Sequence, residues 1–260
     1  MTRLAFIGGI YSNYPALVAT LADIERRGVD GSWFLGDLGA FGPHPNRVPE
    51  LLIEKQIPGI QGNYEESLSS GASDCNCGYT DPRDNAYAQI SYDYTAANTD
   101  DALKQWMGTL PREIRMDVGG LRILLSHGSP RRINEFLWHS TSSEPFLERL
   151  CEESRTDVIL CTHSGLQWHR RLERNRHVVN AGVIGRPAND GRTNVWYTLL
   201  TVERGDVSVE FVPIDYDHQT LAREMRAEHL PAEFIETIET GWWTTCLEIL
   251  PAKERAHSKF

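Results

Sequence analysis

The chain has 260 residues and a formal net charge of −10, with 40% hydrophobic and 24% charged residues. This composition is typical of a globular protein with one sizeable core. Lys and Arg are not clustered as a nucleic-acid-binding surface requires, so we expect no nucleic-acid partner. Because no apolar run approaches the roughly 18 residues of a membrane span and no secretory signal pattern is found, we expect a cytoplasmic protein without membrane association.

The chain contains five cysteines, an odd number, and lacks a secretion signal. We therefore expect reduced thiols rather than a disulfide framework. Cys75 and Cys77 form a Cys-x-Cys pair in the polar stretch Asp74–Asp84. Deprotonated, they offer two soft metal ligands; otherwise they belong to a structured loop with two buried thiols. The sequence leaves both interpretations open.

The N-terminal part alternates apolar strand-like runs with helical patterns. We predict strands at Leu4–Ile7, Trp33–Leu35 and Ile57–Ile60, and helices at Tyr14–Arg27 and Val48–Lys55. Two consecutive parallel strands need a crossover connection between them, usually a helix. This alternation of strands and helices therefore predicts a parallel sheet.

The next segment, from Glu65 to Leu110, starts polar and then shows helical patterns at Asn85–Ala97 and Asp101–Met107. We interpret it as a cap-like insertion at about 65–110 that lies over the sheet edge. The whole chain, 1–260, is predicted to be one domain, with a C-terminal extension at about 214–260.

Strand patterns then return, and helical patterns cover Ser142–Ser154 and His218–Arg226. The Gly119–Gly120 pair indicates a hairpin turn between two of the strands. The predicted strands are Glu113–Val118, Leu121–Leu125, Asp157–Cys161, His177–Asn180, Val195–Val202 and Val207–Pro213.

Four polar residues directly follow predicted strands: Asp37, Asn63, His127 and His163. The carboxyl ends of strands are where α/β sheets build their sites. One such residue alone is usually a turn former or a helix cap, but four of them, several beside glycine, favour a shared site. Two imidazoles, one amide oxygen and one carboxylate suit a divalent transition metal such as Mn, Fe or Zn.

The segments Gly36-Asp37, Gly62-Asn63, Ser126-His127-Gly128 and Thr162-His163 resemble, in order and spacing, the calcineurin-like metallophosphoesterases. Two longer segments, 34–46 and 179–187, are similar to the YfcE and diadenosine-tetraphosphatase-like branch. The resemblance covers roughly residues 1–213. It implies an α/β fold, a four-layer α/β/β/α sandwich with two mixed sheets flanked by helices.

The resemblance also implies a site with two metals bridged by an aspartate. Asp37 matches that bridging carboxylate, and Asn63, His127 and His163 match the other ligands of the second metal. Asp37, Asn63 and His127, with Tyr64, form the implied catalytic set.

The ligands that bind only the first metal, and do not bridge to the second, are missing. Gly9 and Tyr11 stand where the family has Asp and His, and Gly165 replaces its last His. Tyr64 replaces the family's substrate-contacting His. We therefore predict one metal ion, with a second doubtful; Tyr11 is either a phenolate ligand for Fe(III) or an ordinarily packed tyrosine.

Two further residues are candidate substrate contacts beside Tyr64. His44 lies in a loop near Asp37, and Arg131 belongs to an Arg pair that fits either a small anion or a solvated loop. The adjacent tryptophans Trp242 and Trp243 are predicted to pack in the core or at an interface.

The function favoured by these residues is metal-dependent hydrolysis of a small phosphorylated substrate, a phosphomonoester, phosphodiester or nucleotide. Two alternatives stay open: a one-metal enzyme of another reaction, and a non-catalytic ligand-binding protein on the same fold. The resemblance leaves a homo-oligomer open, since members of the family often pair.

Overall fold

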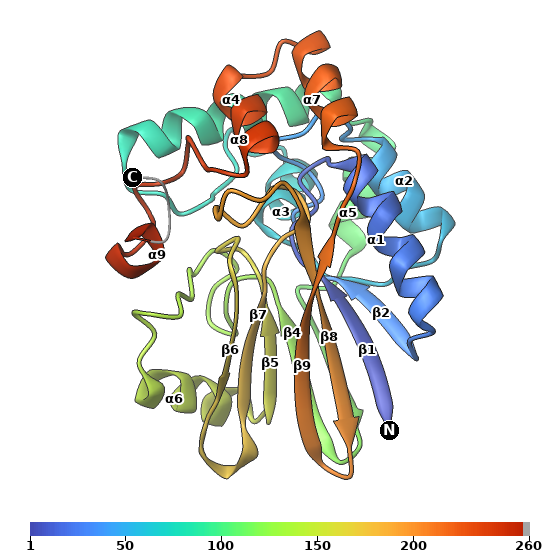
Figure 1. Ribbon diagram of the computed structural model, residues 1–260, viewed down its shortest axis with the longest axis vertical. Helices are drawn as coiled ribbons and strands as arrows, with labels where there is room; N and C mark the ends of the chain where they lie inside the picture. The colour runs from blue at the N-terminus through green and yellow to red at the C-terminus, as the bar shows by residue number, and fades with distance from the viewer. Residues whose placement is uncertain (257–260) are drawn as a thin grey trace.

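Two β-sheets face each other in the computed structural model, which describes residues 1–256 (Figure 1). The first sheet has the order β2-β1-β8-β9. Its strands are β2 (Gly31–Phe34), β1 (Thr2–Ile7), β8 (Val195–Glu203) and β9 (Asp206–Ile214). β1 pairs in parallel with β2 and antiparallel with β8, so the sheet is mixed.

The second sheet has the order β3-β4-β5-β7-β6 and is also mixed. Its central strands β4 (Leu121–Ser126), β5 (Val158–Cys161) and β7 (His177–Ala181) run parallel. The edge strands β3 (Glu113–Val118) and β6 (Gln167–Arg171) pair antiparallel to their neighbours.

Apolar side chains from both sheets meet in the space between them. Leu4 and Phe6 of β1 belong to the same buried cluster as Leu125 of β4 and Leu160 of β5. Burial of this kind provides about 25 cal/mol per Å² of apolar surface, the main driving force for joining the sheets. The parallel strands of each sheet, β1 with β2 and β4 with β5 and β7, are thereby fixed with their carboxyl ends at one edge.

Helices cover the outer face of each sheet, which confirms the predicted four-layer α/β/β/α architecture. α1 (Tyr14–Arg27), α2 (Arg47–Glu54), α7 (His218–Ala227) and α8 (Ala232–Thr240) pack against the first sheet and on one another. α6 (Glu144–Ser154) packs on the second sheet.

The predicted limits of α1 are confirmed, because both ends carry strong local signals. The Asn13 side chain accepts a hydrogen bond from the backbone N–H of Ala16, and Pro15 follows at the first turn. Gly28 ends the helix in the left-handed conformation, which glycine adopts without steric cost.

Three sequence-based assignments differ from the structure. Ile57–Ile60 forms only an isolated bridge, between Gly59 and Phe34, so the predicted strand is wrong. α3 (Asn63–Ser70) was not predicted, because only Tyr64 and Leu68 mark its apolar face. β6 was missed as well, because this polar edge strand, Gln-Trp-His-Arg-Arg, has no apolar alternation.

The segment at about 65–110 forms α4 (Pro82–Asn98) and α5 (Asp101–Thr109) after α3. In Figure 1, α4, α7 and α8 lie above the carboxyl end of β1, and the chain continues to α9 (Ala252–Ala256) beside them. Among residues 1–256, no helix combines the length and apolarity needed to cross a membrane.

A buried carboxylate on α1 ties this helix to the first sheet. Asp23 accepts hydrogen bonds from the Tyr197 hydroxyl at 2.7 Å and from Arg27 Nε at 2.6 Å. Burial opposes ionisation of Asp23, but the bonds from Tyr197 and Arg27 outweigh it and hold the pKa of Asp23 below its usual range. Its stabilising contribution is therefore complete above the unfolded-state pKa of about 4 and is lost as the pH falls through the lower folded-state pKa.

Replacing Asp23 by asparagine should lower the free energy of unfolding at pH 7 by about 1–3 kcal/mol, because a charge-assisted network is lost. The difference from the wild type should shrink steadily as the pH falls below about 4. Urea unfolding across this pH range measures it. A difference that stays constant with pH would contradict the account.

Candidate metal site

Asp37 stands in the loop that follows β2, and close backbone packing fixes this loop. The loop carbonyl of Asp37 accepts hydrogen bonds from the N–H groups of Ile10 and Tyr11, at 2.8 and 3.0 Å. Gly36 has a φ of +87°, and a Cβ there would lie 2.2 Å from the backbone nitrogen of Gly62. Only glycine allows this approach, which brings the β2 loop against the start of α3.

The buried carboxylate of Glu65 joins these two segments. Its oxygens accept three backbone N–H bonds: from Asp37 at 2.8 Å, Leu38 at 2.8 Å and Gly62 at 2.7 Å. Burial and the nearby Asp37 carboxylate raise the pKa of Glu65, while the bonds from Leu38 and Gly62 oppose that rise. Glu65 thus positions Asp37 through the backbone.

His127 and His163 follow β4 and β5, and each ring is oriented by a backbone carbonyl. His127 Nδ1 lies 2.6 Å from the carbonyl oxygen of Leu35, and His163 Nε2 lies 3.2 Å from that of Cys77. Carbonyls only accept hydrogen bonds, so these two nitrogens carry the protons. His127 Nε2 and His163 Nδ1 then face each other at 3.1 Å. Burial opposes the charged form of His127, but the Asp37 carboxylate outweighs it and raises the pKa of this imidazole, so a proton or a cation belongs at Nε2.

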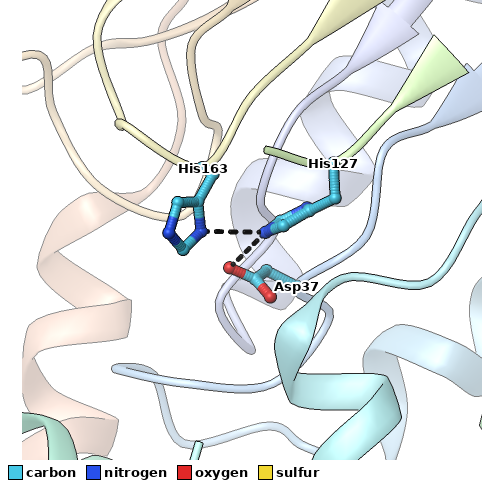
Figure 2. Close-up of side chains that lie close together, drawn as sticks. All are labelled: Asp37, His127 and His163. Carbon is cyan, nitrogen blue, oxygen red and sulfur yellow. Dashed lines mark hydrogen bonds and ion pairs between the residues drawn. The ribbon is translucent and has the colours of Figure 1, made fainter. Parts of the chain in front are cut away.

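Asp37 completes this group (Figure 2). Its Oδ2 lies 3.2 Å from His127 Nε2, and one ligand atom from each of the three side chains lies within 4.8 Å of the others. Burial opposes ionisation of Asp37, but His127 and His163 hold its pKa below the usual range. Burial and the charge of His127 lower the pKa of His163 to about 3.

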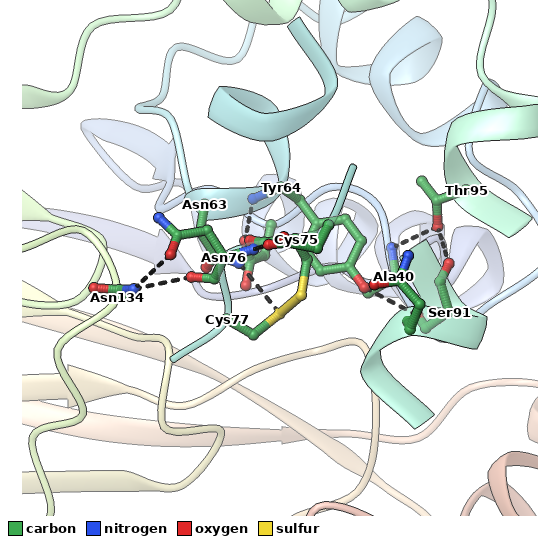
Figure 3. The surroundings of a disulfide bond; sticks show 12 residues. Ala40, Asn63, Tyr64, Cys75, Asn76, Cys77, Ser91, Thr95 and Asn134 are labelled. Atoms are coloured by element: carbon green, nitrogen blue, oxygen red, sulfur yellow. Dashed lines mark hydrogen bonds between the residues drawn. A yellow bond between two sulfur atoms is a disulfide. The ribbon is translucent and has the colours of Figure 1, made fainter. Parts of the chain in front are cut away.

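Asn63, the first residue of α3, is held by the loop 75–77 (Figure 3). Its Nδ2 donates to the Cys75 carbonyl at 2.7 Å, while its buried Oδ1 has no hydrogen-bond partner. The Cys77 carbonyl orients His163, as described above. One short loop therefore fixes the side chains of two predicted ligands.

These observations fit a divalent cation. Metal-bound histidines usually donate their other ring N–H to a carbonyl or carboxylate, as both rings do here. Two facing imidazole lone pairs and an unpartnered buried amide oxygen are each costly without a cation or proton between them. Asp37, Asn63, His127 and His163 would hold the ion, and this donor set suits Mn, Fe or Zn.

Other side chains fill the region of the missing first-metal ligands. A Cβ at Gly9 would lie 2.6 Å from the Tyr11 ring, and one at Gly185 would lie 2.4 Å from it. A Cβ at Gly165 would lie 2.9 Å from the Trp243 indole and 3.6 Å from the Arg186 guanidinium. The lost ligands are thus replaced by packed aromatic rings and a cation.

Tyr11 is buried, and its pKa is raised strongly by that burial and by the Asp37 carboxylate. Both effects keep the phenol protonated. In this structure its ring packs beside Gly9 and Gly185.

A cavity of about 50 Å³ adjoins the ligand group, and Tyr64 lines it. The Tyr64 hydroxyl donates to Ser91 Oγ of α4 at 3.1 Å, and burial raises its pKa. Residues far apart in the sequence line it together, among them Tyr11, Asp37, Tyr64, Tyr79, His163 and Arg186.

His44 and Arg131 do not line this cavity. His44 pairs with Glu224 of α7, Nε2 to Oε2 2.9 Å. Arg131 pairs with Glu135 at 3.3 Å and borders a different groove, which His127 also lines. The structure therefore separates both predicted substrate contacts from Asp37 and His163.

Cys75 and Cys77 are joined in a disulfide. The expectation of reduced thiols is wrong for this pair, although Cys151, Cys161 and Cys246 are free. A disulfide offers no thiolate for a metal, so in this state the pair acts through its carbonyl groups. The sequence did not reveal this, because the odd number of cysteines favoured reduced thiols and a Cys-x-Cys spacing does not by itself indicate a disulfide.

Sequence reasoning missed Arg186 and Cys246, and it assigned the tryptophan pair to general packing. Arg186 and Cys246 line the cavity, and Trp243 packs on the Arg186 guanidinium at 3.5 Å. Trp243 and Cys246 belong to the C-terminal extension, which has no counterpart in the recognised motifs. For Arg186, its place within the motif at 179–187 was the available signal.

Comparison with known proteins agrees with this geometry. The calcineurin-like phosphoesterase superfamily domain matches residues 3–205. The chain therefore belongs to this superfamily. A relative in Methanocaldococcus jannaschii, the uncharacterized protein MJ0912, is 25% identical over 256 residues, covering 92% of this chain and 98% of its own length.

Two crystal structures show the same fold over nearly the whole chain. The hypothetical protein PH1004 of Pyrococcus horikoshii OT3 superposes with a TM-score of 0.78 and 21% identity, covering 94% of this chain and 100% of its own. A metallophosphoesterase of Sphaerobacter thermophilus superposes with a TM-score of 0.71 and 22% identity, covering 92% and 99%.

Glu65→Gln should lower the free energy of unfolding by about 1–3 kcal/mol, because the NH₂ end of the amide faces backbone donors instead of accepting from them. Metal affinity should fall by about 10- to 100-fold, since Asp37 is no longer held in place. Urea unfolding and metal titration measure both effects. Glu66→Gln is the matched control, because the half-buried Glu66 side chain pairs with Arg112 rather than with these backbone donors. Equal behaviour of the two variants would refute the role of Glu65.

Gly9→Ala should destabilise the protein by about 1–3 kcal/mol, because the new methyl group overlaps the Tyr11 ring. The penalty should persist beside Tyr11→Phe, which keeps the ring, and largely vanish beside Tyr11→Ala. Unfolding free energies of the double-mutant cycle measure this coupling. A penalty that is the same in both backgrounds would show that the Tyr11 ring does not occupy this space.

Proposed function

We propose that this protein is a one-metal phosphoesterase that hydrolyses a small phosphorylated substrate. The observation that carries the proposal is a buried group in which His127 Nε2 lies 3.1 Å from His163 Nδ1 and 3.2 Å from Asp37 Oδ2, with one ligand atom of each side chain within 4.8 Å of the others. The orphan Oδ1 of Asn63 supports the same centre. The motifs at 34–46 and 179–187 favour the YfcE and diadenosine-tetraphosphatase-like branch.

The metal, when bound, would supply a Lewis acid for a phosphoryl oxygen and would lower the pKa of a bound water to about 7. Asp37, Asn63, His127 and His163 hold and orient the ion. The Tyr64 phenol is protonated at neutral pH and lines the cavity. Its single O–H donates to Ser91 in this structure, so it would donate to a phosphoryl oxygen by exchanging Ser91 for the substrate as acceptor.

The size of the cavity limits what it accepts. About 50 Å³ is room for a few water molecules, since one water needs roughly 10–15 Å³ by the same measure. A phosphoryl group fits this space, whereas a nucleoside does not. The rest of the substrate must therefore extend out of the cavity.

One observation favours a second candidate, a non-catalytic phosphate-binding protein. The Tyr11 and Trp243 rings fill the region of the first metal, which in the family completes the two-metal clamp. Turnover separates the candidates, because a binding protein would hold metal and phosphate without hydrolysing an ester.

The purified protein, reloaded with Mn²⁺, should contain about one metal ion per chain by elemental mass spectrometry. It should also hydrolyse p-nitrophenyl phosphate or its bis-ester. Asp37→Asn and His163→Gln should lose the metal and reduce turnover by at least about 100-fold, because each removes a ligand.

His169→Gln on β6 is the matched control, since this histidine pairs with His177 rather than with Asp37. It should retain metal and turnover. Metal binding without turnover of any phosphate ester would support the binding-protein candidate. Turnover that survives Asp37→Asn would overturn the proposed site.

A further inference from the structure

Arg186 is a buried cation that interacts with the Asp84 carboxylate only at longer range, without a direct ion pair. It is only 6% exposed, and its Nε has no hydrogen-bond partner. No acidic side chain among residues 1–256 lies within ion-pair distance, 4.0 Å, of its guanidinium group. A buried charge without a partner is strongly unfavourable, so such an arrangement is retained where a ligand supplies the opposite charge.

Aromatic packing fixes the position of this guanidinium. It stacks on the Trp243 ring at 3.5 Å from the ring centroid and lies 5.9 Å from the Phe41 centroid. These cation–π contacts compensate part of the lost hydration, but they use the face of the guanidinium and leave its N–H edge free for an acceptor. The N–H edge is the part that binds oxyanions.

The guanidinium also belongs to the same cavity as the metal ligands. Arg186, Asp37 and His163 line it together. Nη2 lies 3.6 Å from the place of a Cβ on Gly165, the residue that stands where the family has its last first-metal ligand. A fixed positive charge is therefore found beside the region of the missing metal.

We propose that Arg186 binds the phosphoryl group of the ligand and supplies, as a side chain, the positive charge of the missing first metal. This inference rests on the proposed function for the identity of the ligand. A guanidinium matches two free phosphoryl oxygens with two parallel N–H bonds, which lysine cannot reproduce. Trp243 positions Arg186, which explains why the C-terminal extension reaches into the cavity.

Inorganic phosphate is the probe, titrated by calorimetry into the Mn²⁺-loaded full chain. Arg186→Met keeps much of the apolar stem over Trp243 and removes the charge. It should weaken phosphate binding by at least about 10-fold, the effect of one lost charge-assisted contact. Metal content should stay at the wild-type value. Arg149→Met, an exposed arginine on α6, is the control and should change neither quantity.

Arg186→Lys decides the matter if Arg186→Met fails to fold. It keeps the charge but loses the two-point contact, so phosphate binding should weaken by a smaller factor, about 3- to 10-fold. Unchanged phosphate affinity in the folded variants would overturn the inference, as would a wild-type protein that binds no phosphate at about 10 mM, a concentration at which weak anion sites are filled.

The outcomes separate this inference from the proposed function. Phosphate affinity that depends on Arg186, without turnover of any ester, upholds the anion site and refutes the hydrolase. Turnover with phosphate affinity that is independent of Arg186 upholds the hydrolase and refutes the anion site.

Discussion

The site depends on one buried carboxylate that never touches the proposed metal. Glu65 accepts three backbone N–H bonds and so joins the β2 loop to the first turn of α3. These segments carry Asp37 and Asn63, two of the four proposed ligands. The two histidines reach the same point because β4 and β5 are parallel neighbours whose carboxyl ends coincide. A ligand set drawn from four separate segments therefore depends on one hydrogen-bonded junction and one sheet.

The other half of the site shows how a two-metal fold changes when ligands are lost. A site without the first metal and its carboxylate and two imidazoles would have a void, and it would lack the positive charge of that ion. The Tyr11 ring fills space beside Gly9 and Gly185, and the Trp243 indole fills space beside Gly165. Arg186, held on Trp243, returns a positive charge to the cavity. Packing and charge are thus restored together, which accounts for the orderly pattern of the losses better than general decay does.

Local patterns and shared motifs in the sequence were sufficient to predict individual helices, the superfamily and the layered architecture. The helix Tyr14–Arg27 followed from the helical spacing of its apolar residues, and the structure adds Asn13 and Gly28 as its caps. The superfamily and layered architecture followed from the segments around Asp37, Asn63, His127 and His163. Features set by distant contacts were not accessible. The partnering of Arg186 with Trp243 joins residues 57 positions apart, and the carbonyl of Cys77 meets His163 across 86 positions. The stretch 57–60 looked like a strand because it is apolar, yet it pairs at a single bridge.

The central claim is that this chain binds one metal ion where the family binds two. Anomalous diffraction tests it most directly. Crystals soaked with Mn²⁺ and inorganic phosphate should show one anomalous peak among Asp37, Asn63, His127 and His163. A phosphate should lie between that peak and Arg186. Two peaks about 3.5–4 Å apart, as in ordinary two-metal sites, would contradict the account, and so would a fully loaded soak with no peak at these ligands.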